Sequence, residues 1–501
     1  MGKNWLLTAA ALWPRWLAAS KDPRAAQDGL WRELQGLMRV APYWQGRLGT
    51  ATSPELAAMP ITTFDDYREA VDRSYLTTHS ELNGEPLVRW VLSSGSSGVQ
   101  KRFPCTATFL KRKYDGANYP LPIVEFLARM RGGRNGHLML HAMTPTKESP
   151  AGIVEGYGSG FGMPEEDIYP PQANADPEAI RLWRPAYCLA VDLRSIETVT
   201  CEPLYRMVDG FEGNRTFYLE LLRGTRAMPE GYPPLRVTPE RLAYVERRFA
   251  SAEPLTLTEV FPHLRLLHTW RSGVAGIQAA RFAALYPQIK VLDNHYNATE
   301  GPISNPIHPD EIGGPIFADG VLHEFLEPGA APEPSNVIKA WDLEEGRTYE
   351  VLMTTAMGMV RYRLGDLVRC NGFFHKVPKI EFLRRASAEI SMGVSTFGED
   401  ELASALQSAD IPSDTRCVFA PSQDGRALTL YTTQRLPEHV VSHIHERLAE
   451  GNETYGATVT RNWSAAIRNE VVDTGHPYWD ATKAAHDQGK PTILLQTPPT
   501  Q

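Results

Sequence analysis

The sequence predicts an α/β protein built from a large N-terminal domain and a small C-terminal one. Short apolar runs typical of buried strands alternate with helical segments along most of the chain, and this alternation favours mainly parallel sheets. The runs occupy residues 87–92, 137–141, 264–270, 289–295 and 349–355. A chain of 501 residues is also too long for one hydrophobic core, so we expect at least two domains.

The pattern of the sequence changes after Arg385. Three elements are predicted in the segment that follows: a helix over residues 399–409, a hairpin over 416–433 that turns at Asp424-Gly425, and a second helix over 439–450. Together they form an α+β unit of roughly 110 residues, which is within the normal range for a domain. We therefore expect one domain over residues 1–387 and a second over residues 388–501.

Composition excludes several classes of protein. The net charge of −8 lacks the basic character of nucleic-acid-binding proteins. No run of 18 apolar residues occurs, and Pro14 and Arg15 interrupt the apolar N-terminus, so we expect an amphipathic helix there and no membrane span. The 5 cysteines contain no C-x-x-C pair, which suits a reducing compartment. We expect a cytoplasmic monomer without nucleic-acid or membrane partners.

The segment VLSSGSSGVQKR, residues 91–102, follows the first predicted strand. A cluster of serine and glycine between periodic segments is often a surface loop. It is also suited to hold phosphate, because glycine lets backbone N–H groups approach an anion while hydroxyls and Lys101 add donors and charge. Neither the Walker A spacing nor the dinucleotide-binding spacing is present. The segment alone leaves both interpretations open.

Three further segments place polar residues where predicted strands end. They are TWRSGVAG at 269–276, DNHYNATEG at 293–301 and VRYRLGDLVRC at 360–370. Open α/β sheets bind their ligands at the carboxyl ends of strands. Each segment has a plainer interpretation, since Thr299 could cap a helix and Gly-Asp is a common turn pair.

The order of these four segments resembles that of the acyl-adenylate-forming superfamily, which includes acyl-CoA synthetases, luciferases and adenylation domains. The shared order is SSGSSG and Lys, then SG, then Y-x-[AS]-[ST]-E, then Y-R-x-G-D. The chain is most similar to the auxin-responsive acyl acid amido synthetases, the plant enzymes that conjugate auxin or jasmonate to amino acids, and to their bacterial relatives. MPITTFDDYREAVDRS, GVLHEFLE, EGRTYEVLMTTAMGMVRYRLGD and GFFHKVPKIEFLRR carry this closer resemblance, which fades in the last 90 or so residues.

The resemblance implies an ATP-dependent ligase that adenylates a small carboxylic acid and then transfers the acyl group to an amine. It implies that the serine loop and Lys101 hold the β- and γ-phosphates and the departing pyrophosphate. The loop residues are Ser93, Ser94, Gly95, Ser96, Ser97 and Gly98. Such chemistry depends on positioning and charge stabilisation, which suits a site of hydrogen-bond donors and Mg²⁺.

The resemblance also assigns roles in the other three segments. Gly273 lies against the adenine and Tyr296 stacks on it. Thr299 donates to the α-phosphate, Glu300 holds Mg²⁺ through hard oxygen ligands, and Asp366 accepts from both ribose hydroxyls.

Two cationic assignments are less specific. Arg384 or its neighbour Arg385 is implied to reach the same ribose or the phosphate. In this superfamily the small C-terminal domain closes on the active site and usually delivers a lysine, which here corresponds to Lys490 in HDQGKPTILLQ. Only the Lys-Pro pair of the family's pattern is retained, and a solvated lysine is the alternative.

We therefore predict an amide-forming ligase, with an acyl-CoA ligase and a catalytically lapsed nucleotide-binding regulator as the competing functions. The tail lacks a clear CoA-ligase hinge segment, and the intact Glu300, Asp366 and serine loop disfavour the regulator. No G-x-S-x-G elbow supports a serine hydrolase. The identities of the acid and the amine, and the base that deprotonates the amine, are not predicted.

Overall fold

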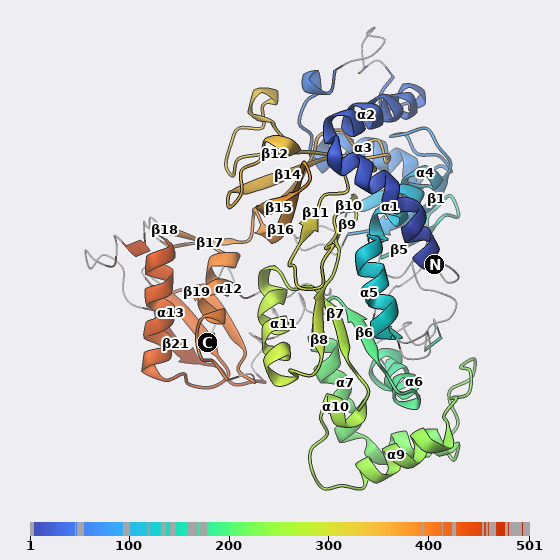
Figure 1. Ribbon diagram of the computed structural model, residues 1–501, viewed down its shortest axis with the longest axis vertical. Coiled ribbons are helices and arrows are strands. Elements are labelled where there is room, and N and C mark those ends of the chain that lie inside the picture. The colour runs from blue at the N-terminus through green and yellow to red at the C-terminus, as the bar shows by residue number, and fades with distance from the viewer. Residues whose placement is uncertain are drawn as a thin grey trace.

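The structure is a computed structural model of the whole chain (Figure 1). It describes residues 5–45, 47, 55–93, 101–118, 120–131, 137–140, 147–157, 169–170, 178–392, 395–412, 414–422, 427–452, 455–456, 459, 467–475, 479 and 493. Among these residues no helix has the length and apolarity needed to cross a bilayer.

Three N-terminal helices cover one end of the molecule: α1 (Trp5–Lys21), α2 (Pro23–Val40) and α3 (Phe64–Tyr75). The Asp22 side chain caps α2 by accepting from the Ala25 N–H, and Pro23 supplies the fixed backbone angle that suits a first turn. A four-stranded mixed sheet lies beside them in the order β2-β1-β5-β4. Its strands are β1 (Leu87–Leu92), β2 (Arg102–Thr106), β4 (Lys147–Glu148) and β5 (Val154–Tyr157).

A parallel sheet in the order β3-β6-β7-β8 forms the middle of the molecule. Its strands are β3 (His137–Leu140), β6 (Ser195–Thr198), β7 (Leu266–Thr269) and β8 (Lys290–Asp293). Helix α5 (Leu121–Arg131) packs on Leu266 and Leu292 of this sheet, and α11 (Gly273–Leu285) follows β7 directly. The remaining helices here are α6 (Arg184–Ala190), α7 (Glu202–Gly213), α8 (Arg215–Arg223), α9 (Pro239–Phe249) and α10 (Leu257–Val260).

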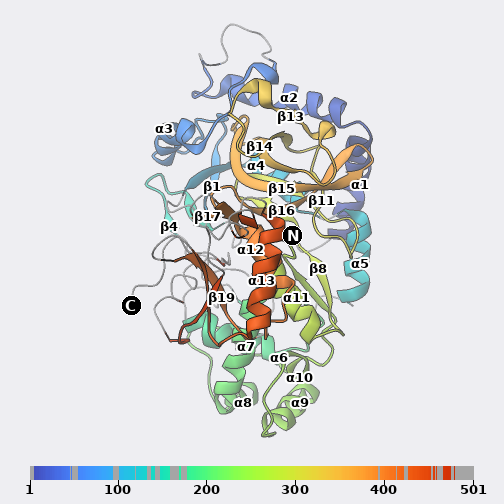
Figure 2. The same ribbon diagram turned by 90° about the vertical axis from the view of Figure 1, so that its left-hand side faces the viewer.

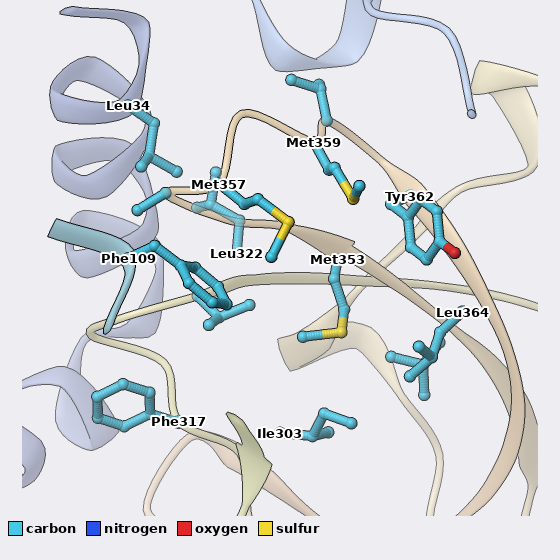
Figure 3. Close-up of a cluster of buried hydrophobic side chains, with 14 of the residues drawn as sticks. Leu34, Phe109, Ile303, Phe317, Leu322, Met353, Met357, Met359, Tyr362 and Leu364 are labelled. Carbon is cyan, nitrogen blue, oxygen red and sulfur yellow. The ribbon is translucent and has the colours of Figure 1, made fainter. Parts of the chain in front are cut away.

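The largest sheet has six strands in the order β11-β16-β15-β14-β12-β13, and every pair in it is antiparallel. They are β11 (Gly314–Pro315), β12 (Leu322–Leu326), β13 (Ile338–Lys339), β14 (Thr348–Thr354), β15 (Tyr362–Phe374) and β16 (Val377–Arg385). Figure 3 shows its core, where Met353, Met357 and Met359 meet Phe109 of α4 (Ala107–Ala117) and Leu34 of α2. A short hairpin of β9 (Tyr296–Ala298) and β10 (Gly301–Ser304) follows β8.

The C-terminal elements pack against α11, beside the end of the antiparallel sheet (Figures 1 and 2). They are β17 (Glu389–Met392), β18 (Ser395–Gly398), α12 (Glu399–Gln407), β19 (Cys417–Pro421), β20 (Leu428–Thr432), α13 (Glu438–Gly451) and β21 (Arg468–Val471). Their buried core includes Val274 and Ile277 of α11. Short 3-10 turns span Leu56–Ala58, Pro334–Asn336 and Ala340–Asp342, and a π-helical turn spans Ala179–Trp183.

The α/β class predicted from the sequence is confirmed, and each predicted strand overlaps an observed one. Parallel pairing is complete in the central sheet, whereas the largest sheet is antiparallel because short connections join β14 to β15 and β15 to β16. The predicted C-terminal helices and hairpin are present, although Asp424 and Gly425 lie outside the described residues. The division at residue 388 falls between β16 and β17 and stays a prediction.

Candidate active site

Ser93 and Lys101, the described ends of the serine loop, are hydrogen-bonded to each other. The Ser93 N–H donates to the Lys101 carbonyl at 2.9 Å, and the Lys101 N–H donates to Ser93 Oγ at 3.0 Å. Because β1 and β2 are antiparallel, this loop is the tip of a hairpin and does not precede a helix. The Lys101 ammonium lies 5.4 Å from the centroid of the Phe64 ring. The rest of the predicted phosphate loop lies outside the described residues: Ser94, Gly95, Ser96, Ser97 and Gly98.

Tyr296, Asp366 and Arg385 form a connected group where the β9–β10 hairpin meets the end of β16. The Tyr296 hydroxyl donates to Asp366 Oδ2 at 2.5 Å, and Arg385 Nη1 lies 2.9 Å from Asp366 Oδ1. Asp366 and Arg385 face each other in the register of β15 and β16. Burial and the adjacent Asp366 carboxylate raise the pKa of Tyr296 well above its ordinary value, so its hydroxyl stays a donor.

Gly273 begins α11 next to this group. Its φ of +56° is in the left-handed region, and a Cβ there would lie 2.8 Å from the Leu383 carbonyl oxygen and 3.4 Å from the Phe382 ring. The Phe382 and Tyr296 rings lie 5.4 Å apart between centroids. Gly273 and Tyr296, which are predicted to contact the adenine, therefore both lie next to the Phe382 ring.

Thr299 and Glu300 form the turn between β9 and β10. Since a strand and not a helix follows, the interpretation of Thr299 as a helix cap is wrong. The Tyr362 hydroxyl lies near Glu300, which is 8% exposed, and burial together with that carboxylate raises the pKa of Tyr362. Glu300 is thus held at the turn with its charge next to the Tyr296–Asp366–Arg385 group.

Lys113 of α4 contacts the backbone of the same turn. Its Nζ donates to the carbonyl oxygen of Ala298 at 2.6 Å and to that of Thr299 at 2.9 Å. Burial lowers the pKa of Lys113 to about 8, and nearby Cys105 and Glu300 oppose this shift.

The two arginines at the end of β16 have different partners. Arg384 pairs with Asp400 of α12 at 2.7 Å and donates to the Arg385 and Ala386 carbonyls. Arg385 reaches Asp366 and also donates to the Leu364 carbonyl. This geometry favours Arg385 over Arg384 as the nucleotide contact. Lys490 lies outside the described residues.

Two residues of this site were missed in the sequence. Tyr362 is the first residue of the Y-R-x-G-D pattern, so the pattern itself could have pointed to it. Lys113 ends a Lys-Arg-Lys run at 111–113, which is typical of a solvated helix face, and no sequence signal distinguishes it from Lys111.

The residues fit a nucleotide. Asp366 is 3% exposed, and its Oδ1 is buried without a hydrogen-bond partner although Arg385 lies beside it, so that it can accept from sugar hydroxyls. The Tyr296 and Phe382 rings lie beside Gly273, and aromatic rings suit an adenine base. Glu300 offers one carboxylate, and Mg²⁺ is usually bound by one or two carboxylates together with substrate phosphates.

The fold of the chain is that of adenylate-forming enzymes. The solved structure of AtGH3.15 acyl acid amido synthetase in complex with 2,4-DB matches with a TM-score of 0.79 and 16% identity, over 98% of this chain and 94% of that one. A 2-hydroxyisobutyryl-CoA ligase with bound 2-HIB-AMP matches with a TM-score of 0.55 and 13% identity, over 96% and 90%. At these identities the likeness is one of fold.

Sequence comparison identifies the family. The family model described as the GH3 family N-terminal domain matches residues 18–187, and that of the GH3 family central domain matches residues 314–385. Indole-3-acetic acid-amido synthetase GH3.8 of Oryza sativa subsp. indica is 33% identical over 443 residues, which are 80% of this chain and 71% of that protein. Indole-3-acetic acid-amido synthetase GH3.3 of Arabidopsis thaliana is 34% identical over 104 residues, 21% and 18% of the two chains.

The chain therefore belongs to the GH3 family. The predicted resemblance to amido synthetases is confirmed, and so is the predicted class of enzyme, an amide-forming ligase that uses ATP.

Proposed function

We propose that this chain adenylates a small carboxylic acid and joins the acyl group to an amino acid, releasing AMP and pyrophosphate. The observation that supports the proposal best is the group of Tyr296, Asp366 and Arg385 beside the turn that carries Glu300. This group combines a hydrogen-bond acceptor for the ribose hydroxyls, an aromatic ring for the base and a carboxylate for Mg²⁺ within one site. GH3.8 is named an indole-3-acetic acid-amido synthetase, which supports the amide product.

In the first step a carboxylate oxygen of the acid attacks the α-phosphorus of ATP, and the bond from that phosphorus to the bridging oxygen breaks. Lys101 and the serine loop hold the pyrophosphate that leaves, while Thr299 donates to the α-phosphate. Asp366 accepts from the ribose hydroxyls, and Tyr296 stacks on the adenine. Mg²⁺, held through Glu300, offsets negative charge on the phosphates when bound.

In the second step the nitrogen of the amino acid attacks the acyl carbon. A carbon–nitrogen bond forms, the bond from the acyl carbon to the AMP oxygen breaks, and the nitrogen of the uncharged amine gives up one proton and keeps the other. The amine must be uncharged to attack, so a base or prior deprotonation is required. The C-terminal elements and Lys490 would act in the adenylation step.

An acyl-CoA ligase is the competing function, since the first half-reaction is the same and CoA ligases share the fold. The GH3 family models cover residues 18–187 and 314–385 and favour the amide. We also propose that the protein acts as a monomer in the cytoplasm, which size-exclusion chromatography and cell fractionation would check.

A panel of carboxylic acids in an ATP–pyrophosphate exchange assay tests the proposal. We expect acid-dependent exchange with at least one member, and then amide formation when amino acids are added to that acid. Thioester formation with coenzyme A and no amide with any amino acid would contradict the proposal.

A further inference from the structure

Lys113 places a positive charge against the backbone of the Thr299–Glu300 turn. Its Nζ donates to two consecutive carbonyls, those of Ala298 and Thr299, at 2.6 and 2.9 Å. Hydrogen bonds from an ammonium to a carbonyl are charge-assisted and stronger than neutral ones. The Thr299–Glu300 turn is therefore held by Lys113, a cation outside the four segments that are predicted to bind the nucleotide.

Helix α4 holds this lysine in one position. A Cβ on Gly116 would lie 2.3 Å from Pro302 Cγ, so the helix contacts β10 without room to shift. Asn305 Nδ2 donates to the Gly116 carbonyl at 2.6 Å and fastens the end of the helix to the segment after β10. At its other end, Thr106 caps the helix by accepting from the Phe109 N–H. The helix is thus a rigid support for Lys113.

The two carbonyls belong to the peptide groups that carry the Thr299 and Glu300 N–H groups. Donation to a carbonyl oxygen withdraws electron density from its peptide group, which makes the N–H of that group a better donor. Two neighbouring N–H groups fixed and polarised in this way are suited to a phosphate. The same helix directly follows β2, the strand that comes after the serine loop.

We propose that Lys113 is a positioning residue for adenylation, which orients and polarises the two peptide groups of the Thr299–Glu300 turn toward the phosphate that is transferred. The proposal rests on the function proposed above. It gives Lys113 no contact with substrate. Its effect belongs to the step in which charge develops on the α-phosphate, because a fixed dipole acts most strongly where charge changes.

Three variants test the proposal by measuring both half-reactions. K113Q keeps a hydrogen-bond donor but removes the charge, K113R keeps the charge and two donors, and K111Q removes a charge from an exposed lysine on the same helix. We expect kcat for pyrophosphate exchange to fall about 10- to 100-fold in K113Q, less than for loss of a direct donor. We expect K113R to recover most of this loss and K111Q to behave as the wild type.

The rate of amide formation from a supplied acyl-adenylate should change by less than about threefold in K113Q, because in that step the amine attacks the acyl carbon and not the α-phosphorus. An unchanged exchange rate in K113Q, or equal losses in both steps without recovery in K113R, would overturn the role of Lys113. If K113Q does not fold, K113M, which also lacks the charge, takes its place, and equal losses in both steps of that variant would overturn the proposal as well. Absence of exchange in the wild type would instead contradict the proposed function.

Discussion

The hydroxyl of Tyr296 lies 2.5 Å from Asp366 Oδ2, which joins residues 70 positions apart in the sequence. Arg385 reaches the other oxygen of the same carboxylate at 2.9 Å. The side chain predicted to bind ribose is therefore already oriented by one hydrogen bond and one ion pair before any nucleotide arrives. Such preorganisation lowers the cost of ordering the site on binding.

Asp366→Asn should weaken ATP binding and leave the fold largely intact. The amide has nearly the same shape as the carboxylate but loses the charge and one acceptor. Each hydrogen bond to a charged group contributes about 1.5–3 kcal/mol, so we expect the Kd for ATP to rise at least about tenfold. Calorimetric titration measures this, with the melting temperature as the control for folding. A Kd equal to that of the wild type would show that Asp366 does not bind the nucleotide.

Replacing Arg384 and Arg385 separately by glutamine distinguishes the roles of these two neighbouring residues. Arg385→Gln should weaken ATP binding, because it removes the cation paired with Asp366. Arg384→Gln should instead break the ion pair with Asp400 of α12 and leave the affinity for ATP within about threefold, since that arginine points away from Asp366. A larger loss of affinity in Arg384→Gln than in Arg385→Gln would reverse the assignment.

Gly273→Ala should destabilise the protein by about 1–3 kcal/mol, because the left-handed backbone and the nearby Leu383 carbonyl both oppose a Cβ. Gly224→Ala is the matched control, since Gly224 has a φ of +72° but open space around its Cβ position. Denaturant unfolding of the two variants compares them. Equal destabilisation would mean that the close contact with Leu383 adds nothing.

Acid should destabilise the fold through His323. Burial lowers the pKa of this histidine to about 3, below its ordinary value of 6.5, so the folded protein keeps it neutral while the unfolded chain protonates it. Above pH 6.5 His323 therefore does not reduce the free energy of unfolding. As the pH falls from 6.5 toward 3, the free energy of unfolding decreases by up to about 1.4 kcal/mol per pH unit. His323→Phe should flatten this pH dependence in chemical denaturation. An identical slope in the variant would contradict the prediction.

Local patterns in the sequence were enough to predict the elements but not how the sheets pair. The run at residues 87–92 coincides with β1, and Ser272-Gly273 does mark the start of α11. Hydrophobic alternation reports burial and says little about the direction of the neighbouring strand, so the antiparallel pairing of β14, β15 and β16 was not anticipated.

In the candidate site, too, the sequence alone does not show which of two similar neighbouring residues contacts the other site residues. Neighbouring residues on a strand point to opposite faces, and a pair of identical arginines gives no sign of which face each occupies. Only the pairing of β16 with β15 directs Arg385 to Asp366 and leaves Arg384 to meet Asp400. Likewise, only the packing of α4 on β10 distinguishes Lys113 from Lys111.

Transfer of an oxygen isotope tests the central claim most directly, that an acyl-adenylate precedes the amide. The acid selected by the exchange assay is labelled with ¹⁸O in its carboxylate and incubated with ATP and an amino acid. We expect one labelled oxygen to appear in AMP, because the carboxylate oxygen bonded to the α-phosphorus leaves with it. Unlabelled AMP, or label in inorganic phosphate together with ADP, would contradict an acyl-adenylate.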